Sequence, residues 1–507
     1  MDDKIIVTNS AALKAKYDST GLTKIGQAVD ALIKTDAKRG IKSRLVFLDR
    51  AATMSSFNAT AVTDPADPKQ NKNAIDAIFR KAKPEYLMIL GAIDVVPHQD
   101  IKNPAFDPPD DPDPNADGDL PYACDTPYSR DIATFKGPTR VVGRLPDLHG
   151  ATGNPAYLLR LLATAANYRS RRATDYAAYF GLSTHSWRKS TAESLFNVFG
   201  DGDALNLAPP SGPAFSAKAL APLAHFINCH GGQSDPQFYG EKGNSQPVSL
   251  TSDSIAKKIK PGTVAAVECC YGAELYDSVT LSVAMPICQR YLNRGAYGFF
   301  GSSTIAYGPE EGNGAADLIT QYFLLALLEG ASLGRAALTA RQRFVEQVGE
   351  LDPVDLKTLG QFNLLGDPSI HPVVIASPTE VPKGVDVEKS ERDERQQRRA
   401  KLRDVGELLQ QTKPTASQKA SKVRKSPAVR KALANIARKA GIGTKKEFTA
   451  YNVKMPKGVR RRGTKAAPTA SRYYVAVYRP GVDDYSVAAV AKEVDGRITG
   501  YRIYMEK

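Results

Sequence analysis

AHFINCHGG, at residues 224–232, and TVAAVECCYGA, at residues 263–273, are the two stretches from which the fold can be worked out. In each, a run of apolar and β-branched residues stops at polar residues and glycine, which is typical of a buried parallel strand followed by a turn. Between them, TSDSIAKKIKPG (251–262) has a polar start, an apolar stripe and a Pro-Gly stop, so it predicts a crossover helix. The two strands are therefore expected to be parallel, with their carboxyl ends at one edge of a sheet.

The two predicted strand ends carry an imidazole and a thiol, on His230 and Cys270. A thiol becomes a good nucleophile as a thiolate, which a neighbouring imidazole favours, and the imidazole can also protonate a leaving group. Because side chains alternate along a strand, Cys229 and Cys269 are expected to point away, into the packing layers. The backbone amides of Gly231 and Cys270 are expected to bind a developing oxyanion.

Two other interpretations of these residues stay open. A histidine at a strand end is often a structural hydrogen-bond partner, as in an inactive scaffold. The imidazole and the neighbouring thiols could instead bind zinc. Adjacent residues diverge from a strand, however, and these pairs lack the two-to-four-residue gap that lets ligands converge on a tetrahedron. The spacing therefore favours catalysis by Cys270 and His230.

A strand ending in His-Gly, followed by a strand ending in Cys, resembles the dyad of the caspase-fold cysteine peptidases. Other segments are similar to the gingipain-type family of clan CD, in a consistent order over residues 1 to 375. These segments are YLMILGAIDVVP (86–97), CDTPY (124–128), TRVVGRLP (139–146), GAYGFFGSSTIAYG (295–308) and FNLLGDPSIHP (362–372). The resemblance implies a cysteine endopeptidase that hydrolyses protein or peptide substrates through a thioacyl intermediate and requires no cofactor.

Strands alternate with helical patterns along most of the chain, which predicts an α/β protein. Combined with the resemblance, this gives a caspase-like, mostly parallel sheet flanked by helices in two subdomains, with a small basic C-terminal β-containing module. The expected boundaries are an N-terminal subdomain at 1–148, a catalytic subdomain at 149–380, a basic, partly helical linker at 381–470 and an antiparallel β module at 471–507.

Charge separates the C-terminal part from the rest. The 507 residues carry a net charge of +14, but residues 381–507 hold 31 Lys and Arg against 13 Asp and Glu, which leaves 37 against 41 elsewhere. Such a region can bind an acidic partner or nucleic acid through charge, or it can simply be solvated. A basic linker also suits proteolytic processing. The alternatives to a peptidase are therefore an inactive caspase-fold scaffold and a nucleic-acid- or partner-binding protein.

A segment rich in Pro and Asp, residues 103–122, is expected to be a surface loop. Four of its residues have the spacing of the first half of a calcium loop: Asp113, Asn115, Asp117 and Asp119. Cys124 stands where the bidentate glutamate of such a loop belongs, so a solvated acidic turn is the alternative. Calcium binding is frequent in the gingipain-type family, and calcium is the one cofactor that we consider.

Two acidic residues are candidates for supporting roles. Asp125 lies in a segment that the family places beside the substrate cleft, where it could orient His230. Glu268 lies at the strand end before the thiols and is expected to serve packing more than chemistry. Arginine-specific gingipains carry an acidic residue close to where this chain has Thr134 to Lys136, so the resemblance predicts no residue preference at the cleavage site.

The start of the chain, MDDKIIVTNS, does not resemble a signal peptide, and no run approaches the roughly 20 apolar residues of a membrane span. Five cysteines, an odd number, do not indicate a disulfide framework. These observations favour a cytoplasmic protein that does not bind membranes.

Overall fold

The computed structural model of the chain describes residues 2–309, 312–374, 387–420, 423, 425–443, 446–456, 471–481 and 484–507. The side chains of residues 387–393 and of residue 418 are not described. Residues 381–386 and 457–470, which belong to the expected linker at 381–470, lie outside the described residues.

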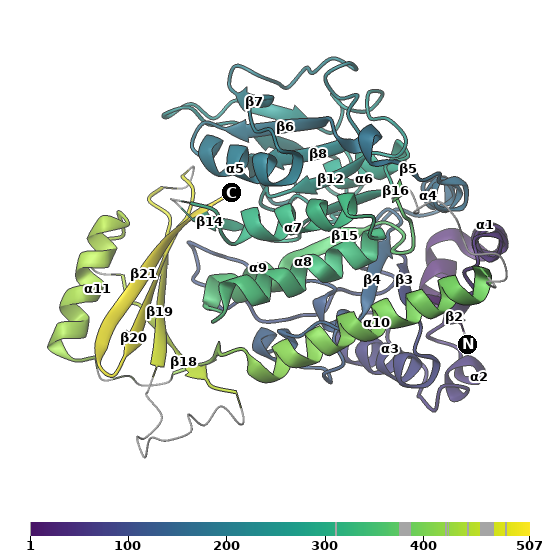
Figure 1. The fold of residues 1–507 in the computed structure, drawn as a ribbon, viewed down its shortest axis with the longest axis horizontal. Helices are drawn as coiled ribbons and strands as arrows, with labels where there is room; N and C mark the ends of the chain where they lie inside the picture. Colours follow the sequence, from purple (N-terminus) through teal and green to yellow (C-terminus); the bar gives the residue numbers. More distant parts are fainter. Residues whose placement is uncertain are drawn as a thin grey trace.

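A ten-stranded sheet runs through the centre of the molecule (Figure 1). From edge to edge its strands are β2 (Ser43–Phe47), β1 (Lys4–Thr8), β3 (Tyr86–Leu90), β4 (Val141–Leu145), β15 (Phe362–Leu365), β13 (Gly298–Ser302), β12 (Val264–Val267), β8 (Ala224–Asn228), β6 (Tyr179–Thr184) and β7 (Leu205–Ala208). Neighbouring strands are parallel except for β13 and β15, which pair antiparallel. Two parallel halves of opposite direction therefore meet at this pair, and the expected boundary at residue 148 lies just after β4.

Helices cover the sheet, as short apolar strands buried on both faces require. They are α1 (Ser10–Lys38), α2 (Ala51–Ser55), α3 (Pro68–Ala82), α4 (Ala156–Asn167), α5 (Arg188–Phe199), α6 (Ile287–Asn293), α7 (Ala316–Leu328), α8 (Leu333–Val348), α9 (Pro353–Gln361) and α10 (Val387–Thr412), with 3₁₀ turns at Leu120–Ala123, Ile132–Phe135 and Ala173–Tyr176. Figure 1 shows α7, α8 and α10 side by side on one face. The prediction of a mixed α/β protein with a mostly parallel sheet is confirmed.

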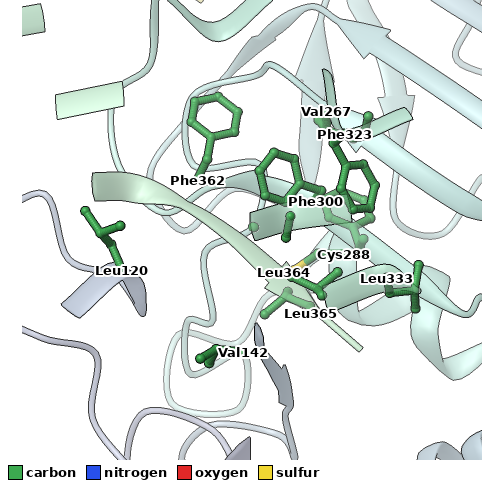
Figure 2. Packing of buried hydrophobic residues seen from close by; sticks show 14 of the residues in the cluster. Leu120, Val142, Val267, Cys288, Phe300, Phe323, Leu333, Phe362, Leu364 and Leu365 are labelled. Carbon is green, nitrogen blue, oxygen red and sulfur yellow. The ribbon is translucent and has the colours of Figure 1, made fainter. Parts of the chain in front are cut away.

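Buried aromatic side chains pack together where the two halves of the sheet meet. Figure 2 shows Phe300 of β13 between Phe323 of α7 and Phe362, with ring centroids 4.6 and 5.8 Å apart. Cys288 of α6 is buried in the same cluster. Burial of each such aromatic side chain stabilises the folded state by about 2–3 kcal/mol. This junction therefore holds the two halves of the sheet together.

The predicted crossover helix at residues 251–262 is wrong. The chain leaves β8 through a small sheet of β9 (His230–Gly231), β10 (Gln237–Tyr239) and β11 (Val248–Thr251), and then forms turns up to β12. Thr251 and Ser254 exchange bonds between their hydroxyls and the backbone, at 2.8 to 3.1 Å. Such local bonds compete with a helix, and turns still bury Ile255 and Ile259.

A second, antiparallel sheet is formed mainly by the C-terminal part of the chain (Figure 1). Its order is β14 (Tyr307–Pro309), β21 (Arg497–Glu506), β20 (Val487–Val494), β19 (Ser471–Tyr478), β18 (Thr449–Lys454) and β17 (Thr415–Lys419). The helix α11 (Pro427–Lys439) packs against β20 and β21. The expected antiparallel meander is present as β19, β20 and β21. It is extended at both edges, and β14 comes from the preceding part of the chain, residues 149–380.

A further two-stranded sheet pairs β5 (Arg171–Arg172) with β16 (Val373–Val374).

No helix within the described ranges combines the length and the hydropathy that crossing a bilayer requires. The cytoplasmic location of the chain stays a prediction.

Candidate active site

His230 and Cys270 each lie three residues beyond the last pair of two neighbouring parallel strands. β8 and β12 pair from Ala224 opposite Val264 to Ile227 opposite Val267, so the segments that carry the imidazole and the thiol leave the sheet next to each other. The contact is close, because a Cβ on Gly231 would lie 2.0 Å from the carbonyl oxygen of Cys270. Only glycine fits at this position.

The two adjacent cysteines face different surroundings. The amide of Cys229 donates to Sγ of Cys269 at 3.4 Å, inside the core. Sγ of Cys270 instead accepts from the amide of Ala306 at 3.2 Å and lies 3.4 Å from its carbonyl oxygen, in the loop that follows β13. The alternation expected from the sequence therefore separates the two thiols.

The backbone turns sharply directly after Cys270. Tyr271 has a φ of 53°, in the left-handed region that residues with a side chain rarely adopt. Its hydroxyl donates to Asp113 at 2.8 Å, and the other carboxylate oxygen of Asp113 accepts from the amide of Ile305 at 2.9 Å. Asp113 thus braces both segments that flank the thiol of Cys270.

The imidazole of His230 lies in an aromatic and acidic environment. Its Nε2 atom is 3.2 Å from Oε2 of Glu241, and Trp187 packs edge-on with centroids 4.5 Å apart. Tyr485, from the loop between β19 and β20, stacks on the ring at 3.4 Å with the planes 10° apart. Nδ1 of His230 has no hydrogen-bond partner among the described residues. Burial lowers the pKa of His230, and the carboxylate of Glu241 opposes that shift.

The C-terminal strand covers the thiol. The amide of Cys270 donates to the carbonyl oxygen of Lys507 at 3.1 Å, and the amide of Lys507 donates to Ala306 at 2.9 Å. Cys270 is fully buried as a result. Burial, followed by the negative charge of Glu506, raises the pKa of the Cys270 thiol well above its usual range.

The side chain of Lys507 enters a buried acidic pocket. Its ammonium lies 2.7 Å from Glu268 and 2.7 Å from Asp317, and 4.8 Å from the centroid of the Trp187 ring. Both carboxylates are fully buried. Burial and the neighbouring Asp317 raise the pKa of Glu268 well above its usual range, and the ammonium of Lys507 opposes that shift.

A cavity of about 450 Å³ opens beside the imidazole. It is lined by residues that precede position 310 and by residues of the C-terminal part, including His230, Gly231, Tyr271, Tyr485 and Glu506. The cleft that would receive a ligand is therefore shared between the two parts of the chain.

Three of the four residues of the candidate calcium loop have side-chain hydrogen bonds to other described residues. Asp119 binds the guanidinium of Arg144 with both oxygens, and Asn115 accepts from Arg130. Asp113 contacts Tyr271 and Ile305 as described above, and burial raises the pKa of Asp117 to about 6. Among the described residues, no group of three or more His, Cys, Asp or Glu side chains is arranged to hold a metal ion. Calcium binding stays a prediction.

The two supporting candidates lie in different places. The carboxylate of Asp125 accepts from Arg140 at 2.8 Å and from Thr139, and its side chain is half exposed. Glu268 lines the pocket of Lys507. The acidic partner of His230 is Glu241, which sequence reasoning missed because it arrives through the β9–β10 hairpin. Asp317, Tyr485 and Lys507 were missed too, since each lies on a distant element.

The fold and the site geometry define the class of protein: an α/β protein whose mostly parallel sheet carries an imidazole and a thiol at adjacent strand ends. Residues 223–373, which contain both, match the model of peptidase family C25. The resemblance to gingipain-type peptidases is confirmed over this segment, and the match supports a cysteine peptidase.

Two solved structures show weaker likeness. One, described as "Structure of Protease", is 12% identical, and the alignment covers 99% of this chain and 97% of that chain with a TM-score of 0.48. The other is the separase–securin complex of Saccharomyces cerevisiae, 14% identical over 46% of this chain and 14% of that chain, with a TM-score of 0.26. At these TM-scores neither likeness supports a conclusion about function. No curated protein sequence matches the chain.

Proposed function

We propose that the protein is a cysteine endopeptidase in which Cys270 is the nucleophile and His230 is the general acid and base. The observation that carries this proposal is the alignment of the two residues at the ends of β8 and β12, within the segment that matches peptidase family C25. A peptidase of this kind acts on protein or peptide substrates.

The proposed reaction uses groups that lie along this edge of the sheet. The thiolate of Cys270 attacks the carbonyl carbon of a peptide, and the amide of Cys270 donates to the developing oxyanion, with Gly231 as the second candidate donor. The C–N bond then breaks, and the amine leaves with a proton from His230. Water adds to the thioacyl carbon and gives its proton to His230, which releases the acid and restores the thiol.

Glu241 is a positioning residue in this scheme. Its carboxylate lies 3.2 Å from Nε2 of His230 and favours the protonated imidazole. A thiolate paired with an imidazolium is the reactive state of such a site. Nδ1 of His230, which lacks a partner among the described residues, is free to face a reacting group.

The test is a comparison of two adjacent cysteines. The full chain, Cys270→Ala and Cys269→Ala are each incubated with a pooled peptide library, and new termini are read by mass spectrometry. A second series carries Lys507→Gln in all three proteins, because Lys507 lies against Cys270. We expect cleavage to fall on the order of a thousandfold or more in Cys270→Ala only, because the nucleophile is lost.

Cys269→Ala is the matched control, since it removes the same atom from the neighbouring residue. Cleavage that persists in Cys270→Ala would contradict the proposed nucleophile. Absence of cleavage in both series would favour the alternative of an inactive caspase-fold scaffold.

A further inference from the structure

The last strand of the chain lies along the candidate active site in the manner of a bound peptide. β21 pairs antiparallel with the short edge strand β14, with Glu506 opposite Tyr307 and Tyr504 opposite Pro309. The pairing ends at the amide of Lys507, which donates to Ala306. Addition of an extended segment to a free strand edge is a common mode of peptide recognition.

The carbonyl group of Lys507 lies where the reactive carbonyl of a substrate belongs. Its oxygen is 3.1 Å from the amide nitrogen of Cys270, the distance expected for an oxyanion donor. Lys507 therefore has the position of the residue whose carbonyl carbon the thiol attacks.

The pocket around the side chain of Lys507 is built for a long cation. Glu268, at the end of β12, and Asp317, in the first turn of α7, both contact the ammonium. Gly308 makes room for the stem, since a Cβ at this position would lie 2.0 Å from Cε of Lys507. Two buried carboxylates without a cation would be costly, so the pocket favours a basic occupant.

The same C-terminal part also covers the imidazole and contacts acidic residues in both preceding parts of the chain, at 1–148 and at 149–380. Tyr485 stacks on His230, and the amide of Arg479 donates to Asp110 at 2.8 Å. Lys446 lies 3.1 Å from Asp107, and Lys492 lies 3.0 Å from Glu350. Some of the basic residues after residue 380, Lys446 and Lys492 among them, thus contact acidic groups of the same chain.

We propose that β21 is an internal inhibitor that occupies the substrate cleft, and that the pocket of Glu268, Asp317 and Gly308 accepts a lysine side chain of the substrate once Lys507 leaves. This inference rests on the proposed peptidase function. This pocket is formed by β12, the β14 edge and α7. The acidic residue of arginine-specific gingipains corresponds to a different place, close to Thr134 of this chain.

Release of the strand is measured without any substrate. Lys507→Glu places a negative charge against Glu268 and Asp317, and Arg497→Glu makes the same charge reversal at an exposed position of the same strand. The rate at which iodoacetamide labels Cys270 is followed by mass spectrometry. We expect a rise of roughly ten- to hundredfold in Lys507→Glu, because the closed state loses a buried ion pair, and no change in Arg497→Glu.

Selectivity is measured on peptides that differ at one residue. The Lys507→Glu protein is given peptides with lysine or norleucine before the scissile bond, which differ by the ammonium group alone. We expect lysine to be preferred by roughly tenfold or more, and Glu268→Gln or Asp317→Asn in the same protein to reduce this ratio. Arginine peptides form a third arm and show whether the pocket distinguishes the two cations.

The outcomes separate this inference from the proposed function. Equal rates of Cys270 labelling in the wild type and in Lys507→Glu overturn the proposal that β21 is an internal inhibitor. Equal cleavage of lysine and norleucine peptides overturns the proposal that the pocket accepts lysine. If that cleavage depends on Cys270, the proposed peptidase function still holds. Faster labelling of Cys270 without cleavage of any peptide supports the proposal that β21 covers the thiol. It contradicts the proposed peptidase function. Circular dichroism checks the fold, and Lys507→Gln, a neutral variant, provides a second test in the same direction.

Discussion

Two buried ionic clusters lie at strand ends in opposite halves of the sheet, and they differ in where their partners come from. At the end of β4, Arg144 binds Asp119 at 2.6 and 2.9 Å and the carbonyl oxygen of Val96 at 2.6 Å. After β12, Lys507 binds Glu268 and Asp317 at 2.7 Å each. The partners of Arg144 lie within 53 residues of it, whereas those of Lys507 lie 239 and 190 residues away.

The difference indicates two roles for similar chemistry. Arg144 is held by segments of its own half, so its cluster persists as long as that half is folded. Lys507 follows β21, which lies between β14 and β20 in another sheet, so its cluster can open if the end of β21 detaches locally from β14. The first cluster is structural, and the second has a removable cation.

Substitution of each cation by methionine gives the largest contrast. Arg144→Met leaves Asp119 buried and unpaired, so we expect the free energy of unfolding to fall by roughly 3–5 kcal/mol. Lys507→Met is expected to lower it by less than about 2 kcal/mol, because β21 can detach and let water reach the carboxylates. Urea denaturation measures both. Equal losses would mean that the two clusters are equally structural.

Gly308→Ala is expected to displace Lys507 from Glu268 and Asp317 and to leave the cluster of Arg144 unchanged. In Gly308→Ala the new Cβ collides with the lysine stem, so labelling of Cys270 by iodoacetamide should accelerate roughly tenfold. Cleavage of lysine peptides should not increase, because the same collision excludes their side chains. Gly500→Ala, in β21 with open space around it, is the matched control. An unchanged labelling rate in Gly308→Ala would contradict the tight fit.

The pH dependence of labelling sharpens the comparison further. Burial raises the pKa of the Cys270 thiol, so in the wild type the rate should continue to rise with pH beyond the range of an exposed cysteine. Only the thiolate reacts, and water reaches it when β21 leaves. In Lys507→Glu the pKa of Cys270 should therefore be lower, and the rate should level off at a lower pH. Identical profiles would show that the strand does not shield the thiol.

The smallest expected effect concerns Glu241. Glu241→Gln keeps a hydrogen-bonding group but removes the charge that raises the pKa of His230, so that pKa should fall. Because a neutral imidazole cannot protonate the leaving amine, the alkaline limb of the kcat/KM profile should move to lower pH. At neutral pH we expect a loss of roughly fivefold in kcat/KM, measured in the Lys507→Glu background. Asp125→Asn is the control, and a larger effect there would restore Asp125 as the supporting residue.

The mixed α/β fold and the mostly parallel sheet could be predicted because strands of the AHFIN and TVAAV type leave few alternatives. The turns at 251–262 could not be predicted, since the bonds of Thr251 and Ser254 that favour turns compete with the apolar stripe that indicated a helix. Local pattern also could not reveal that β14 joins the C-terminal sheet, because three residues carry almost no periodic signal.

The site was predictable to the extent that it follows from two adjacent strand ends. His230 and Cys270 each end an apolar run, and the common register aligns them. Glu241, Asp317 and Lys507 reach the site through a hairpin, a helix start and a separate sheet, so no spacing in the sequence connects them. The basic composition of the C-terminal part was visible, but its acidic contacts within the chain were not. Binding of nucleic acid or of another acidic partner by this region stays a prediction.

Gly308 and the two carboxylates hold the chain's own lysine in the pocket that we assign to the substrate. Latency and selectivity then depend on the same few atoms. A substitution that widens, neutralises or narrows this pocket changes which peptides are accepted and, at the same time, how firmly the enzyme is switched off. The two properties therefore depend on the same residues. A variant with a new substrate preference would need a matching change at residue 507 for β21 to keep inhibiting it.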